Sequence, residues 1–172
     1  MYAFPLLIGD DEVFSESQLQ KARESGPWMD SPSSVRYLIL HCSATRETDD
    51  YTVQRLLRDH RARGFRTVGY HFYIRRDGTV TQHRRLLEVG AHCFPFNRCS
   101  IGICYEGGLD RQSHPADTRT DAQRLRLRDL LAKLIRLFPQ ARIMGHRDMP
   151  GTTPKACPCF HVRREYSWME PD

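Results

Sequence analysis

The sequence predicts one α/β domain, with a central mixed sheet of five to six strands flanked by helices. Three observations predict it. Short apolar, β-branched runs alternate along the chain with amphipathic helical patterns. The pair Asp77-Gly78 separates two strand-like runs and indicates a hairpin. The length of 172 residues suits a single domain that buries a core without disulfide staples.

The composition excludes several classes of protein. Hydrophobic residues make up 40% and charged residues 27% of the chain, and no apolar run approaches the roughly 20 residues of a membrane span. The N-terminal apolar patch has no basic residue before it, so we expect no secretory signal. The net charge of +5 suits an anionic partner. The arginines are spread out, however, and no basic helix or aromatic-basic strand pattern indicates nucleic acid binding.

We expect an N-terminal extension over residues 1–34 and the main domain over residues 35–172. The extension carries one weak helical stretch, about 15–24, followed by the turn-rich segment 25–34. It could be an ordered arm on the domain, a flexible tail or the product of an upstream start codon.

The first half of the domain predicts a strand, a helix and a hairpin. Residues 35–42 form a buried strand in which Tyr37 and His41 share one face. A helix then begins after Thr52 and ends near Gly64. Residues 69–84 form the hairpin, in which we expect Tyr70 to share a face with Phe72 and Ile74.

The second half predicts a strand, a long helix and a last strand. Residues 100–108 are strand-like and end in two glycines. Thr120 and Gln123 match a capping box, and Pro139 stops the helix that follows. Residues 141–146 form a short strand that ends in His146, and a loop rich in Pro, Gly and Thr follows over 147–160.

Two predicted strands thus end in a histidine, His41 and His146, and the loop after the second carries Cys157 and Cys159. Three ligands from strand ends and a loop are what an open zinc site requires, with the fourth position left for water. The spacing alone leaves a reactive thiol, a disulfide partner or an ordinary loop cysteine open, because it is no local motif. Without a secretory signal, a metal ligand or buried thiols are favoured over a disulfide framework for the six cysteines.

Six short sequence motifs occur in order along the chain: LILHCSAT, VGYHFYIRRDGTV, VGAHCFPFN, SIGICYEGG, GHRD and PKACP. Together they resemble the type 2 N-acetylmuramoyl-L-alanine amidase family, which includes zinc-dependent phage lysozymes and peptidoglycan recognition proteins. The resemblance runs from about Val35 to about Trp168 and is strongest to the phage branch. It implies that residues 35–172 are an amidase catalytic domain with a zinc site in a surface groove.

The resemblance also implies the site residues. His41, His146 and Cys157 match the zinc ligands, whereas Cys159 does not. Tyr70 and Lys155 match the catalytic tyrosine and lysine. His92 and Asn97 fall in a segment that lines the substrate groove in relatives.

The implied reaction is hydrolysis of the amide between the muramic acid lactyl group and L-alanine of peptidoglycan. Zinc activates the attacking water, Lys155 stabilises the oxyanion and Tyr70 orients the water. The alternative is a non-catalytic peptidoglycan-binding module, from which the metal ligands, typically the cysteine, have been lost. We expect a monomeric, bacteriolytic endolysin, made in the cytoplasm and reaching the cell wall after release or export.

Two departures and one open question remain. The stretch between His146 and Pro154 is longer than in the shortest phage members, and residues 1–34 match no counterpart. We expect Cys42 and Cys104 to be buried thiols, and a Cys93–Cys99 disulfide stays open.

Overall fold

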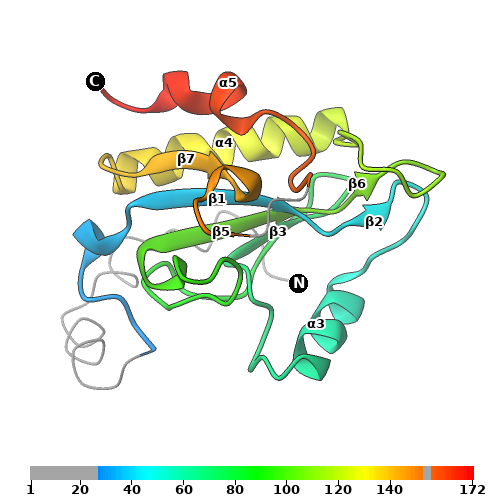
Figure 1. Ribbon diagram of the computed structural model, residues 1–172, viewed down its shortest axis with the longest axis horizontal. Coiled ribbons are helices and arrows are strands. Elements are labelled where there is room, and N and C mark those ends of the chain that lie inside the picture. The colour runs from blue at the N-terminus through cyan, green and yellow to red at the C-terminus, as the bar shows by residue number, and fades with distance from the viewer. Residues whose placement is uncertain (1–26, 153–155) are drawn as a thin grey trace.

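The computed structural model describes residues 27–152 and 156–172, and the helical stretch expected at 15–24 lies outside them. Its elements form a single mixed α/β domain (Figure 1). In chain order they are η2 (Pro32–Ser34), β1 (Tyr37–Cys42), β2 (Thr45–Arg46), α3 (Val53–Ala62), β3 (Phe72–Ile74), β4 (Val80–Gln82), η3 (Asn97–Cys99), β5 (Ser100–Tyr105), β6 (Gly108–Leu109), α4 (Asp121–Leu137), β7 (Arg142–Gly145), η4 (His146–Asp148), α5 (Val162–Tyr166) and η5 (Ser167–Met169).

The central sheet has five strands in the order β4-β3-β5-β1-β7. β1 runs parallel to both β5 and β7, β3 runs parallel to β5, and only β4 is antiparallel to its neighbour. A second sheet pairs β2 with β6. The predicted fold class is therefore confirmed, and the carboxyl ends of β1, β5 and β7 meet at one edge of the sheet.

Helices cover both faces of this sheet. α4 and α5 lie on one side and α3 lies on the other (Figure 1). The buried leucines of α4 belong to the same core cluster as Leu38 and Leu40 of β1, which alternate with Tyr37, Ile39 and His41. His41 therefore shares a face with Tyr37, as the strand pattern predicted, and this face is the one opposite α4.

Local signals in the sequence explain where the helices begin. Thr52 accepts a hydrogen bond from the Arg55 backbone N–H at 3.2 Å, which caps α3. Thr120 and Gln123 form the expected reciprocal capping box before α4. Caps of this kind are worth about 1 kcal/mol each.

The face expected for Tyr70 was wrong. β3 begins only at Phe72, so Tyr70 precedes the regular alternation of the strand. Phe72 and Ile74 join the core under α4, whereas Tyr70 packs with Tyr73 and Leu56 on the α3 side. This places Tyr70 on the same side of the sheet as His41.

The described end of the extension packs on the domain as an ordered arm. Met29 is 1% exposed and lies in the main core. Its backbone N–H donates to the Leu87 carbonyl at 2.7 Å, and the Val89 N–H donates to the Pro27 carbonyl at 2.7 Å. The boundary expected at residue 34 stays a prediction. Within the described ranges, no helix is both long and apolar enough to cross a bilayer.

Candidate metal centre

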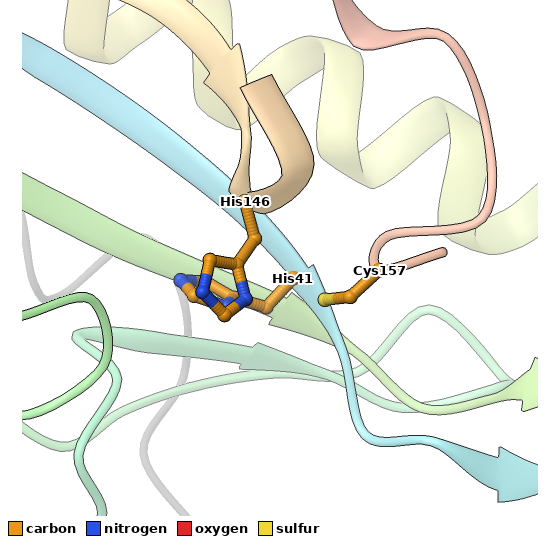
Figure 2. Close-up of side chains that lie close together, drawn as sticks. All are labelled: His41, His146 and Cys157. Carbon is orange, nitrogen blue, oxygen red and sulfur yellow. The ribbon is translucent and has the colours of Figure 1, made fainter. Parts of the chain in front are cut away.

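Three side chains from separate segments come together at the carboxyl edge of the sheet. His41, His146 and Cys157 each offer one donor atom, and these atoms all lie within 4.8 Å of one another. The three side chains point toward one another (Figure 2). This is the set that the sequence predicted as metal ligands.

The parallel pairing of β1 with β7 brings the two histidines together. Leu40 of β1 is in register with Gly145, the last residue of β7, and each of the two is followed by a histidine: His41 within β1, and His146 at the start of η4. Their ring centroids lie 4.7 Å apart. The sheet, rather than a flexible loop, thus fixes the positions of two of the three donors.

The loop after η4 is held so that Cys157 reaches this pair. The Arg147 N–H donates to the Cys157 carbonyl at 3.0 Å, and the Tyr105 hydroxyl donates to the Pro158 carbonyl at 2.6 Å. The Cys42 N–H donates to the Cys157 Sγ at 3.4 Å. These bonds fix the sulfur on the side of the loop that faces the two histidines.

Cys159 lies outside this donor group. Its thiol donates to the Gly108 carbonyl at 3.2 Å, and its Sγ is 3.9 Å from the Cys42 Sγ. The hydrogen bond with Cys42, and then burial, raise the pKa of the Cys159 thiol. The structure therefore separates the two cysteines of the PKACPCF segment: Cys157 faces the histidines and Cys159 faces Cys42.

Burial holds the histidine at the centre of the cluster in its neutral form. His41 is 2% exposed. Its pKa lies well below the usual value, first because burial penalises the charged ring and then because His146 is close. Neutral imidazole is the form of histidine that binds a metal ion.

Tyr70 lies beside the cluster. Its ring centroid is 5.1 Å from that of His41. Burial, and then the nearby thiols of Cys104, Cys157 and Cys42, hold the pKa of the Tyr70 hydroxyl well above its usual value. The hydroxyl therefore keeps its proton at neutral pH, and in this structure it is hydrogen-bonded with the Cys104 thiol.

The other predicted site residues have different outcomes. Lys155 lies outside the described residues. His92 contacts the donor cluster directly, because its Nδ1 lies 2.9 Å from the Nε2 of His41. The Asn97 Oδ1 accepts hydrogen bonds from the N–H groups of His92 and Cys93 at 2.9 and 2.8 Å.

The contact between His92 and His41 was missed by the sequence reasoning. The two residues are 51 positions apart, and the contact depends on how the loop before β5 lies over β1. Burial first, and then the neighbouring imidazoles of His41 and His71, hold the pKa of His92 well below its usual value. No local motif in the sequence signals this contact.

The remaining cysteines are free thiols. Cys42 and Cys104 are buried in strands, as predicted. Cys93 packs with Ile39 and Met149, while the Cys99 thiol donates to the Phe96 carbonyl at 3.5 Å. The structure thus has no Cys93–Cys99 disulfide.

The donor set fits a zinc ion by its chemistry. Two imidazoles and one thiolate are ligands that zinc prefers, and three protein ligands are typical of sites that keep a fourth position open. No other group of three such donors is found in the described parts of the chain. The fold and this cluster together define an α/β domain with three potential metal-binding donors at the ends of parallel strands.

Comparison with known proteins gives the family. The profile described as N-acetylmuramoyl-L-alanine amidase matches residues 31–160, about three quarters of the chain. The chain belongs to the N-acetylmuramoyl-L-alanine amidase family. This confirms the family expected from the six sequence motifs, and with it the prediction of an enzyme that cleaves peptidoglycan.

Phage endolysins are among its relatives. The endolysin of Klebsiella phage KP32 is 41% identical over 133 residues, covering 77% of this chain and 84% of its own. The endolysin of Escherichia phage T7 is 38% identical over 137 residues, covering 80% of this chain and 87% of its own.

A solved structure agrees with this result. The N-acetylmuramoyl-L-alanine amidase LysC from Clostridium intestinale superposes with a TM-score of 0.64 at 27% identity. The match covers 78% of this chain and 83% of that one.

Proposed function

We propose that this chain is a zinc-dependent, endolysin-type amidase that cleaves the bond between N-acetylmuramic acid and L-alanine in peptidoglycan. The observation that carries the proposal is the convergence of His41, His146 and Cys157 in a member of the amidase family. A non-catalytic binding module is the alternative. The complete donor set argues against it, because a module that only binds the wall has no need of an open metal site.

Zinc held by His41, His146 and Cys157 would lower the pKa of a water ligand toward about 7 and polarise the amide carbonyl. The chain's own residues do the rest. Burial keeps His41 neutral, and the Cys42 N–H holds the Cys157 Sγ in place by a hydrogen bond at 3.4 Å. Both effects prepare the donors for a cation before it binds.

Tyr70 is proposed as a catalytic hydrogen-bond donor. Its ring lies against His41, and its raised pKa keeps the proton on the hydroxyl. A fixed donor beside the reacting carbonyl stabilises negative charge as it develops on the oxygen. It also orients the attacking water.

Lys155 is proposed as the second source of oxyanion stabilisation. The support comes from the sequence, in which Lys155 stands two positions before Cys157, as in the K-x-C-P word of the family. A cation near the carbonyl oxygen favours the tetrahedral transition state over the planar amide.

A substrate contact by Asn97 stays a prediction. Its Oδ1 already accepts hydrogen bonds from two backbone N–H groups. A hydrogen bond to the stem peptide or the sugar would therefore be donated by its Nδ2. The substrate contact predicted for His92 also stays a prediction.

The endolysin relatives support the proposed place of action. The enzyme is made in the cytoplasm and degrades the cell wall after release or export. We propose that it acts as a monomer and needs no nucleic acid partner.

The test is a digest of purified peptidoglycan with and without a zinc chelator, with the products identified by mass spectrometry. We expect stem peptides with a free N-terminal L-alanine, lost on chelation and restored by added zinc. A protein that holds no zinc and releases no stem peptides would overturn the proposal in favour of the binding module.

A further inference from the structure

We propose that His92 is a positioning residue for the metal centre, which fixes the tautomer and ring orientation of His41 through a chain of hydrogen bonds starting at the Phe96 carbonyl. The inference rests on the proposed zinc site. It gives His92 a role that acts through a ligand rather than through the substrate.

The chain of hydrogen bonds starts at a group that can only accept. The Ser100 hydroxyl donates to the Phe96 carbonyl at 2.7 Å. A serine hydroxyl has one proton, and this bond uses it. Toward the His92 Nε2, which lies 3.3 Å from its oxygen, Ser100 can therefore only accept.

The direction of each later bond follows from this. The His92 Nε2 must carry the proton that Ser100 accepts, so in the neutral ring the His92 Nδ1 is an acceptor. The His92 Nδ1 lies 2.9 Å from the His41 Nε2. The His41 Nε2 is then the donor, and His41 keeps a free lone pair on Nδ1 for a metal ion.

The fold also holds the His92 ring in place. A Cβ added at Gly102 would lie 2.6 Å from the His92 ring, and one added at Gly90 would lie 2.7 Å from it. Both contacts are shorter than real Cβ atoms make, so the ring fills a slot that two glycines leave open. The backbone of His92 is fixed as well, because its N–H donates to the Asn97 Oδ1 at 2.9 Å.

His92 meets the ring of His41 at a right angle. The two centroids are 5.0 Å apart and the planes are inclined by 88°. A partner at the second nitrogen of a metal-binding histidine sets both its tautomer and its orientation, and removing such a partner typically weakens metal binding by about 10–100-fold. We expect an effect of that size here.

The experiment measures zinc affinity by competition with a chromophoric chelator. His92→Leu removes the acceptor and should weaken zinc binding by about 10–100-fold. His92→Asn places an amide oxygen close to where Nδ1 stood, and should recover most of the affinity. His83→Leu is the matched control, because His83 is also partly buried but bonds to Thr81, outside the cluster.

A second readout separates a positioning role from a merely structural one. In the cobalt-substituted protein, the visible absorption bands should change in His92→Leu and return toward wild type in His92→Asn. Ser100→Ala leaves the His92 ring in place but frees its tautomer, so its zinc affinity should fall between those of wild type and His92→Leu.

The inference is overturned if His92→Leu binds zinc as tightly as wild type while its KM rises, because that is the result of a substrate contact. If His92→Leu fails to fold, wild-type zinc affinity and cobalt bands in Ser100→Ala overturn it instead. A wild-type protein that binds zinc but releases no stem peptide would sink the proposed function alone, since the affinity series would still decide the role of His92.

Discussion

Replacing each cysteine of the PKACPCF segment in turn tests which thiol binds the metal. Cys157 points at the two histidines, whereas Cys159 is bonded to Gly108 and lies beside Cys42. Cys157→Ser should therefore abolish tight zinc binding, and Cys159→Ser should keep it. The two substitutions are the same in chemistry and lie two residues apart, so each is the control for the other.

The size of the effect follows from linkage between binding and folding. The three donors lie on β1, at the end of β7 and on the following loop, so the unfolded chain has no assembled site. Free zinc at about 1,000 times its Kd then stabilises the folded state by about 4 kcal/mol. In a domain of this length, that raises the Tm by about 8–16 °C.

Thermal unfolding with zinc and with a chelator measures this difference. Wild type and Cys159→Ser should both show the full zinc-dependent rise in Tm, and Cys157→Ser should show little. A loss of the rise in Cys159→Ser, with the rise retained in Cys157→Ser, would refute the choice of ligand.

Three further predictions concern residues around the cluster. Tyr70→Phe should lower kcat about 100-fold and leave zinc affinity unchanged, because the substitution removes only the hydroxyl donor; a rate equal to wild type would contradict the catalytic role. Burial lowers the pKa of His71 from 6.5 to about 4. The unfolded chain therefore binds the extra proton between these pH values, and stability should fall by about 3 kcal/mol as the pH drops from 6.5 to 4. Urea unfolding across this range should show a smaller loss in His71→Gln, and an equal loss would exclude His71 as a source. The buried Glu106 accepts from the Arg75 Nε and the Tyr51 N–H, both at 2.7 Å. Glu106→Ala leaves these two N–H donors unpaired, while Arg75 keeps its ion pair with Asp50, and should cost about 1–3 kcal/mol in the same assay; no measurable cost would count against this account.

Signals that act within a few residues were readable from the sequence. Two such signals are the capping box of Thr120 and Gln123 and the turn at Asp77-Gly78. Each depends only on contacts between residues close in sequence, so it can be recognised without knowing the tertiary fold. The alternation in β1 likewise predicted the face of His41, because side chains in a strand alternate regularly. The metal ligands were predicted instead from the resemblance to the motifs of the family, because the spacing of the three donors along the chain does not form a recognisable local motif.

Features that depend on tertiary pairing were not readable. The side of Tyr70 was wrong because the regular strand begins two residues later than its apolar pattern indicated. The bond between His92 and His41 needs the parallel pairing of β1 with β5 and the loop that precedes β5. Neither periodicity nor residue type records which strands become neighbours.

The most direct test of the account is to locate the bond that is cut. Purified muropeptide is hydrolysed in ¹⁸O-labelled water by the zinc-loaded protein, and the masses of both products are measured by mass spectrometry. The account predicts one ¹⁸O atom in the muramic acid carboxyl group and an unlabelled stem peptide with a free L-alanine amine. Label in the glycan reducing end or in a peptide carboxyl group would contradict it, because the enzyme would then be a glycosidase or a peptidase.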